Sequence, residues 1–158
     1  MVTVKESIKQ SRPFPNTAAE AYFNIVLLAQ DLLHRSSQVL RPYELSLPQY
    51  NALRILRGAG EEGRTCREIG ERMVHRVPDV TRLLDRLEAR GLITRQRSPM
   101  DRRMVRVAIT PAGEEMLAPL DTPMADLHAT TLGPLGEEKL RALIALLEEA
   151  RDHAARDA

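Results

Sequence analysis

The amino-acid sequence predicts a mainly helical (α+β) fold that carries one short β-hairpin. Aromatic residues make up 3% of the 158 residues and tryptophan is absent, so aliphatic side chains must form the core, as they do in packed helices. Apolar residues recur at helical spacing along most of the chain. The period changes to strand-like alternation only over residues 92–97 and 104–109. We therefore expect one domain with a helical extension.

The N-terminal part is predicted to form an arm followed by a long helix. Residues 1–16, which include two prolines, are expected to be a flexible N-terminal arm. Thr17 and Glu20 have the spacing of a capping box, in which the side chains of the first turn accept the free backbone N–H groups. This box should open a helix with a wide aliphatic stripe, which Pro42 ends.

Two further helices follow, each preceded by a capping box. Ser46 with Gln49 and Thr65 with Glu68 have the same S/T-x-x-E/Q spacing. The glycine-rich stretch 58–63 should form the loop between these two helices. The second of them is short.

The next helix begins near Pro78 and ends at Gly91, since glycine commonly follows a helix C-terminus. Only a turn at 74–77 separates it from the preceding helix. Its apolar residues follow the i, i+3, i+4, i+7 rule: Val80, Leu83, Leu84 and Leu87. Two short helices joined by a tight turn and followed by a hairpin form the winged helix-turn-helix arrangement.

The hairpin and its surroundings concentrate positive charge. Between Arg64 and Thr110 the chain holds twelve arginines and six acidic residues, although the whole chain has 23 Lys+Arg against 22 Asp+Glu. Such asymmetry is typical of a surface that binds a polyanion, and a solvated face with internal salt bridges is the open alternative. One face of the second strand should carry three apolar side chains, Val105, Val107 and Ile109.

The C-terminal part is expected to be helical. Thr110 is the predicted N-cap of the next helix, and Pro111 its first residue. Pro119 and Pro123 should kink or break this helix. A connector at 133–136 leads to a last helix, which has four apolar residues on one stripe: Leu140, Leu143, Ile144 and Leu147.

Several classes of function find no support in the sequence. No apolar run is long enough to span a membrane, the N-terminus lacks a secretory signal, and one cysteine permits no internal disulfide, so we expect a cytoplasmic protein. No catalytic or nucleotide-binding motif is present, so we expect no enzyme and no cofactor. The histidines lie far apart and form no metal-binding pair: His34, His75, His128 and His153.

Three segments, taken in order, resemble the MarR family of bacterial transcription regulators. LSLPQYNAL at 45–53 is similar to the family's second-helix signature, and VPDVTRLLDRLEARGLITR at 77–95 resembles its recognition helix and the start of its wing. DRRMVRVAITPAG at 101–113 resembles its wing motif and the helix start that follows. The resemblance extends from Thr17 to about Arg151.

The resemblance implies a homodimeric, DNA-binding transcription regulator. Residues 17–45 and 111–158 would form its helical dimerisation region, and residues 46–110 its winged helix-turn-helix DNA-binding region. The implied partners are double-stranded DNA with a pseudo-palindromic operator, a second copy of the chain and a small-molecule effector, with no membrane. The implied mode of action is repression, which a small aromatic or phenolic anion relieves by preferring the dimer that does not bind DNA.

The helix after the turn is expected to enter the major groove, and the hairpin to reach the minor groove or the backbone. Arg82 is the first choice for bidentate hydrogen bonding to a guanine, with Asp79 and Thr81 beside it. Arg86 either contacts a phosphate or forms an internal salt bridge to Asp85 or to Asp101 of the wing. The other expected DNA contacts are Thr65, His75, Arg76, Arg97, Arg102 and Arg103.

Some roles in this region stay open. By the resemblance, Asp101 orients the wing and Arg103 reaches the minor groove. Arg95 and Arg106 either meet phosphates or face only water. Thr65 is a helix cap first, and the helix N-terminus that it opens would also suit a phosphate.

Two sets of residues suggest regulation. Helices that border the family's pocket carry four candidate effector contacts, Tyr22, His34, Tyr50 and Arg54. Cys66 lies beside Arg64 and Arg67 in the first turn of a helix, which would favour its thiolate and an oxidant-sensing role, while a small buried residue is the alternative. A cysteine-based oxidant sensor and a winged-helix protein-interaction module that does not bind DNA therefore remain open alternatives.

Overall fold

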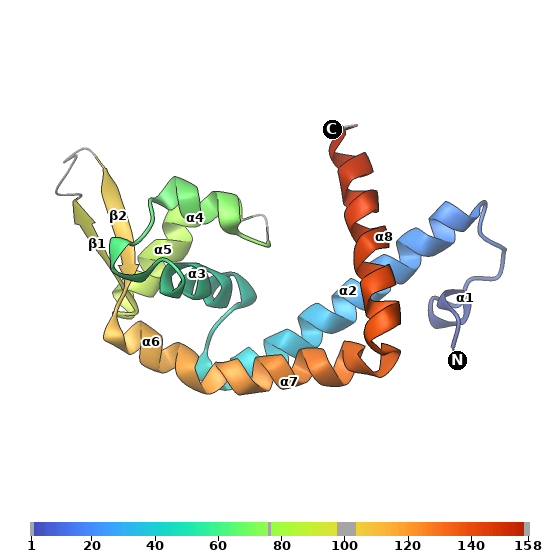
Figure 1. Ribbon diagram of the computed structural model, residues 1–158, viewed down its shortest axis with the longest axis horizontal. Coiled ribbons are helices and arrows are strands. Elements are labelled where there is room, and N and C mark those ends of the chain that lie inside the picture. Colours follow the sequence, from blue (N-terminus) through green and yellow to red (C-terminus); the bar gives the residue numbers. More distant parts are fainter. Residues whose placement is uncertain (1, 76, 98–103, 157–158) are drawn as a thin grey trace. The chain divides into compact units, whose positions relative to one another are not determined.

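The computed structural model describes residues 2–75, 77–97 and 104–156, and the chain divides into two compact units (Figure 1). Met1–Ala118 make up the first unit, which contains helices α1 to α6 and the hairpin. Pro119–Ala158 make up the second unit, which contains α7 and α8. The predicted fold class is confirmed, since the described structure is mainly helical and has a two-stranded wing.

The N-terminal segment holds more structure than the flexible arm predicted for residues 1–16. A single helical turn, α1 (Val4–Ser7), is closed by a capping box between Thr3 and Glu6. The side chain of Val4 is buried. The expectation of a wholly irregular arm is therefore wrong, because a capping box and one buried apolar side chain hold this turn.

The long helix α2 spans Thr17–Leu40, but Thr17 is not its cap. The Oδ1 of Asn16 accepts a backbone N–H of the first turn at 2.8 Å, so the N-cap lies one residue earlier than predicted. Asparagine caps a helix at least as well as threonine. The predicted end is confirmed, since α2 stops just before the short 3-10 turn Arg41–Tyr43, which contains Pro42.

Three short helices build the helix-turn-helix: α3 (Leu47–Arg57), α4 (Cys66–Arg72) and α5 (Val80–Ala89). The capping boxes predicted before α3 and α4 are both confirmed. The three helices gather beside the hairpin (Figure 1) and bury aliphatic side chains, among them Leu53, Leu56, Ile69, Leu84 and Leu87. Each fully buried leucine or isoleucine stabilises the fold by roughly 1.5–3 kcal/mol, so aliphatic side chains supply most of this core.

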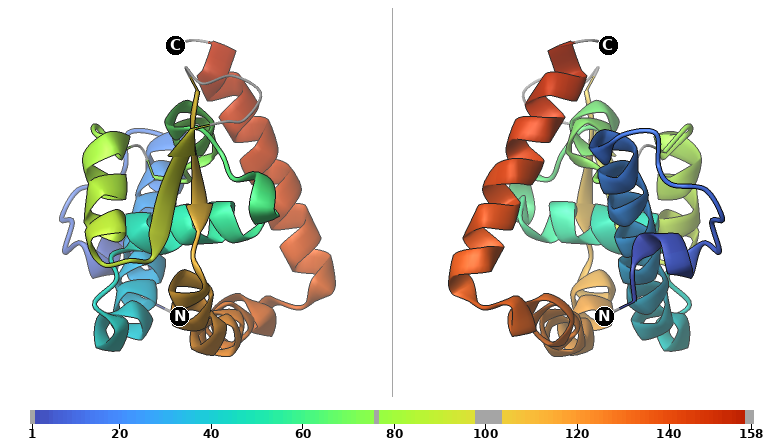
Figure 2. Two further views of the ribbon diagram at one scale, coloured as in Figure 1. Left: turned by 90° about the vertical axis from the view of Figure 1, so that its left-hand side faces the viewer. Right: turned by 90° about the vertical axis from the view of Figure 1, so that its right-hand side faces the viewer.

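The hairpin consists of β1 (Ile93–Arg97) and β2 (Val105–Ile109), which pair antiparallel. Figure 2 shows the two strands side by side, with α5 next to β1. A separate bridge attaches the hairpin to the segment before α4. There the Arg64 N–H donates to the Val107 carbonyl at 2.8 Å, and the Val107 N–H donates to the Arg64 carbonyl at 2.7 Å.

The apolar face predicted on β2 is buried only in part. Val107 is 1% exposed and Ile109 is half-buried, whereas Val105 is 45% exposed. Val107 pairs with the segment before α4, while Val105 lies at the outer end of the strand, opposite Arg97. The alternation of residues along β2 thus predicts correctly which side chains share a face. Packing of the strand against the segment before α4 decides which of these side chains are buried.

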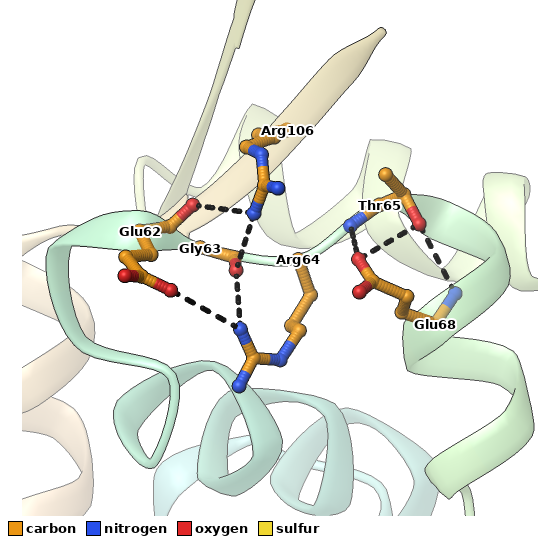
Figure 3. A network of polar contacts seen from close by, with 6 residues as sticks. All are labelled: Glu62, Gly63, Arg64, Thr65, Glu68 and Arg106. Atoms are coloured by element: carbon orange, nitrogen blue, oxygen red, sulfur yellow. Dashed lines mark hydrogen bonds and ion pairs between the residues drawn. The ribbon is translucent and has the colours of Figure 1, made fainter. Parts of the chain in front are cut away.

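The loop before α4 leaves no room for a side chain at Gly63. The φ angle of Gly63 is +61°, and an added Cβ would lie 2.4 Å from the Val107 carbonyl oxygen. Glycine adopts this conformation without strain and lets the two backbones approach. Figure 3 shows this loop and the polar side chains around it.

Helix α6 (Pro111–Leu117) begins as predicted, with Thr110 as its N-cap. The two later prolines, which were predicted to kink or break this helix, lie in different elements. Pro119 lies in a 3-10 turn, whereas Pro123 lies in the first turn of α7 (Asp121–Leu132), where the missing N–H costs little.

In the second unit, the 3-10 turn Gly133–Leu135 forms the corner between α7 and α8 (Glu137–Arg156) (Figures 1 and 2). None of the described residues of α8 is buried. Large apolar side chains on it face solvent, namely Ile144, Leu146 and Leu147. A helix with an apolar stripe needs a second surface to bury it, so α8 is suited to a partner.

We expect Gly63→Ala to destabilise the first unit by about 1–3 kcal/mol, because the new Cβ meets the Val107 carbonyl and the backbone stays at positive φ. The matched control is Gly60→Ala, since Gly60 has φ +60° but an added Cβ there has no atom within 4 Å. Urea unfolding followed by circular dichroism measures both variants. Equal losses of unfolding free energy would show that the close approach to Val107 has no effect.

The capping box of α4 should make stability depend on pH. The Thr65 N–H and hydroxyl donate to the Glu68 carboxylate at 2.7 and 3.0 Å, and these hydrogen bonds lower the pKa of Glu68. A carboxylate whose pKa is lower in the folded state than in the unfolded state stabilises the fold at pH values above the unfolded-state pKa. This stabilisation is lost as the pH falls through the folded-state pKa.

Glu68→Gln keeps a capping partner and removes the charge. The wild type should be more stable than this variant at neutral pH, and the difference should shrink below pH 4.5, the ordinary value of the carboxyl. Urea unfolding at a series of pH values measures the difference. A difference that stays constant down to about pH 3 would contradict the role of the ionised carboxylate.

Candidate nucleic-acid interface

The first turn of α5 carries the side chains predicted to contact base edges. Asp79 is the N-cap of this helix, and its Oδ1 accepts the Arg82 N–H at 2.8 Å. The carboxylate therefore has a structural role that the sequence analysis did not assign. Thr81, Arg82 and Arg86 are exposed. Within the described part of the chain, neither the Arg82 nor the Arg86 guanidinium has a hydrogen-bond or ion-pair partner.

The turn between α4 and α5 is held by a residue that sequence reasoning missed. The Oδ1 of Asn51, on α3, accepts the Val74 N–H at 2.9 Å. This contact ties the turn to α3 and leaves the Val74 side chain 80% exposed. His75 is half-buried, and Arg76 lies outside the described residues. No local pattern marks Asn51, because its partner is 23 residues away.

Arg95, on β1, forms ion pairs with two carboxylates of α5. Its Nη2 lies 2.7 Å from the Asp85 Oδ1, and its Nη1 lies 2.5 Å from the Glu88 Oε2. The wing strand is therefore linked to α5 by two ion pairs, a role that the sequence analysis did not weigh for Arg95. Burial alone would lower the pKa of Arg95, but its hydrogen bonds and charge interactions with Asp85 and Glu88 outweigh this and raise the pKa.

Two more arginines donate hydrogen bonds to backbone carbonyls. The Arg106 Nη1 donates to the Glu62 carbonyl at 3.1 Å and to the Gly63 carbonyl at 3.4 Å (Figure 3). Arg90 donates to the carbonyls of the turn that follows α2, at 2.8 and 3.2 Å. Arg106 thus supports the loop that receives the hairpin, and its contact with phosphate stays a prediction.

The remaining wing candidates divide into two groups. Arg97 is exposed near the end of β1. Asp101, Arg102 and Arg103 lie outside the described residues, so their predicted roles stay predictions. Thr65 is the N-cap of α4, as expected, and is half-buried.

Cys66 is half-buried between α4 and α5. Its Sγ lies 3.6 Å from the Thr81 Oγ1. The two arginines expected to favour its thiolate have other partners, because Arg67 pairs with Glu71 at 2.8 Å and Arg64 donates to the Gly63 carbonyl at 3.1 Å. Redox sensing through Cys66 stays a prediction.

The four candidate effector contacts are not brought together at one place. Tyr50 is buried, and the Arg54 guanidinium lies 5.8 Å from the centre of its ring. Tyr22 and His34 are exposed on α2, where Tyr22 packs edge-to-face on Phe23. A separate open hollow, which the sequence did not predict, is lined by Gly60, Glu61, residues 108–111, Glu114 and Glu115.

Two further expectations concern the described residues only. Over these residues, no three histidine, cysteine, aspartate or glutamate side chains are grouped so that they could hold a metal ion. The same part of the chain contains no helix both long and apolar enough to cross a membrane.

Comparison with known proteins shows which family this chain resembles. The family model described as MarR family matches residues 43–104, which span the helix-turn-helix and most of the wing. The HTH-type transcriptional regulator TtmR of Methylorubrum extorquens (strain PA1) is 35% identical over 114 residues. These residues are 72% of this chain and 56% of TtmR, so the chain spans little more than half the length of that relative.

Solved structures extend the likeness to the helical flanks. A crystal structure of a MarR transcription factor from Planctomyces limnophilus is 38% identical, covers 86% of this chain and 98% of that one, and has a TM-score of 0.65. A mutant of MarR from E. coli, complexed with operator DNA, is 24% identical with a TM-score of 0.76 over 88% of this chain and 99% of that one, which shows the same fold. The expectation of a regulator rather than an enzyme is thereby confirmed. The chain belongs to the MarR family of transcription regulators.

Proposed function

We propose that the chain binds double-stranded DNA as a homodimer and regulates transcription from an operator. The observation that carries this proposal is helix α5, which follows a tight turn and exposes the guanidinium groups of Arg82 and Arg86. All three acidic side chains of this helix and its cap have other partners: Asp79, Asp85 and Glu88. The helix therefore presents cations to a polyanion.

In this proposal α5 lies in the major groove and Arg82 donates to a guanine. Thr81 and Arg86 contact neighbouring base edges or phosphates. Asp79 caps the helix through its Oδ1, which accepts the Arg82 N–H, and its second carboxylate oxygen is proposed to contact a neighbouring base edge. The remaining proposed contacts are to the backbone and the adjacent minor groove, from His75, Arg76, Arg97, Arg102 and Arg103.

The proposed dimer uses the helices of residues 17–45 and 111–158. Support comes from α8, on which no described residue is buried although Ile144 is 54% and Leu146 is 64% exposed. Similar exposure on α2 includes Ile25, at 48%. Two copies would present two α5 helices to half-sites about one helical turn apart on a pseudo-palindrome.

The finer proposal is that a small anionic aromatic ligand relieves repression. Arg54 beside the Tyr50 ring offers a cation and an aromatic face together, which suits such an anion. The exposed Tyr22 and His34 are further candidate contacts. A ligand that prefers the dimer unable to bind DNA weakens DNA binding by its difference in affinity for the two states. Such a regulator acts in the cytoplasm.

Arg82→Ala should weaken binding to the operator by about 1–3 kcal/mol and relax the preference at one base pair. Fluorescence anisotropy measures this with a duplex from the region upstream of the protein's own gene and a random duplex, across salt concentrations. The matched control is Arg141→Ala, which removes the same charge from α8, where Arg141 pairs with Glu137 at 2.8 Å. The control should leave affinity unchanged.

The outcomes of this titration are distinct. Tight, sequence-dependent and salt-sensitive binding by the wild type supports the proposed function. Equal binding of both duplexes by the wild type would mean that α5 does not read this sequence, and selection from a random pool then tests for another operator. No binding at low salt would overturn the DNA proposal and leave a winged-helix protein-interaction module.

Ile144→Asp should raise the dissociation constant of the dimer roughly tenfold or more, because it buries a charge in the proposed apolar interface. The matched control is Ala145→Asp, which adds the same charge roughly 100° around α8 from Ile144 and off the stripe of Leu140, Leu143, Ile144 and Leu147, and should leave the dimer intact. Sedimentation equilibrium measures both variants. Dimerisation that survives Ile144→Asp unchanged would contradict a dimer built on the stripe of α8.

A further inference from the structure

Helix α5 carries two carboxylates that would oppose binding to DNA if they had no partner. Asp85 and Glu88 lie one turn apart on the helix, and their side chains are 56% and 40% exposed. Both lie close in sequence to Arg82 and Arg86, the cations proposed to contact DNA. An unpaired carboxylate there would repel the phosphates and offset one of these cations.

A single guanidinium engages both carboxylates. The Arg95 Nη2 lies 2.7 Å from the Asp85 Oδ1, and the Nη1 lies 2.5 Å from the Glu88 Oε2. The Nη2 also donates to the Thr81 carbonyl at 3.4 Å. The planar fork of arginine permits this arrangement, because its two terminal nitrogens diverge toward acceptors one helical turn apart.

The environment of Arg95 differs from that of an arginine that binds phosphate. Its side chain is 25% exposed, less than either of its partners. Both of its terminal nitrogens are already engaged. Arg97, two residues later on the same strand, is exposed and has no hydrogen-bond or ion-pair partner within the described residues. The strand therefore offers two arginines in contrasting environments.

We propose that Arg95 is a positioning residue of the DNA interface, which engages Asp85 and Glu88 and cancels one of their two negative charges, so that the cations of helix α5 meet DNA with less repulsion. The inference rests on the proposed function. It assigns Arg95 no contact with DNA. Removing Arg95 would leave two exposed carboxylates on the helix that approaches the phosphates.

A double-mutant cycle separates this role from a direct contact. The four proteins are the wild type, Arg95→Gln, the pair Asp85→Asn with Glu88→Gln, and the triple variant that combines them. Each is titrated by fluorescence anisotropy, as the full-length protein, with one labelled duplex that the wild type selects from a random-sequence pool. Thermal unfolding by circular dichroism reports whether each variant is folded.

We expect Arg95→Gln to weaken binding roughly five- to tenfold when Asp85 and Glu88 are present, and by less than about twofold when both are neutral. The Asp85→Asn, Glu88→Gln pair should bind the duplex more tightly than the wild type, since it removes two negative charges and frees the Arg95 cation. An equal loss from Arg95→Gln in both backgrounds would show a direct phosphate contact and overturn the proposal. Weaker binding by the Asp85→Asn, Glu88→Gln pair would show that the ion pairs only orient the wing, which also overturns it.

Arg97→Gln is the matched control on the same strand. Arg97→Gln should change the affinity for DNA equally in the wild type and in the Asp85→Asn, Glu88→Gln pair. The reason is that the Arg97 side chain has no carboxylate partner among the described residues. If Arg95→Gln does not fold, the Asp85→Asn, Glu88→Gln pair decides alone, by tighter or weaker binding than the wild type. A wild type that binds no duplex overturns the proposed function itself, whereas normal wild-type binding with additive variants overturns only the role of Arg95.

Discussion

A backbone bridge docks the hairpin on the segment that opens α4, and the proposed DNA surface depends on it. Arg64 and Val107 exchange two hydrogen bonds of 2.7 and 2.8 Å, which places β2 against the segment that opens α4. The bridge requires a residue without a side chain at Gly63. Arg106 completes the contact by donating to the carbonyls of the same loop. A main-chain contact therefore fixes where the wing lies relative to the helices.

The arginines of the winged-helix region serve different purposes, although the sequence presents them as one cluster. Arg90 and Arg106 donate to backbone carbonyls, and Arg95 pairs with two carboxylates. Arg82 and Arg86 are exposed on α5, and their guanidinium groups have no partner among residues 2–75, 77–97 and 104–156. Much of the positive charge thus stabilises the fold, and a smaller part is available to a polyanion. A count of charges alone would overstate the electrostatic attraction to DNA.

The second unit carries an apolar surface that is stable only when another surface buries it. Helix α8 has the amphipathic pattern of a buried helix, yet none of its described residues is buried. In the proposed dimer, a second copy of the chain covers this surface. The reading helix α5 thus lies in the first unit of the chain, whereas the apolar stripe of α8 lies in the second.

The sequence by itself determined the order of the elements, the capping boxes at Ser46 and Thr65, and the winged helix-turn-helix arrangement, because these depend on contacts within a few residues. Local reasoning placed the α2 cap one residue late, since Asn16 and Thr17 are both good caps. Only the tertiary structure decided that Asn51 holds the turn and that Arg95 pairs with α5. These contacts join residues that lie far apart or on different elements, and no periodicity records them.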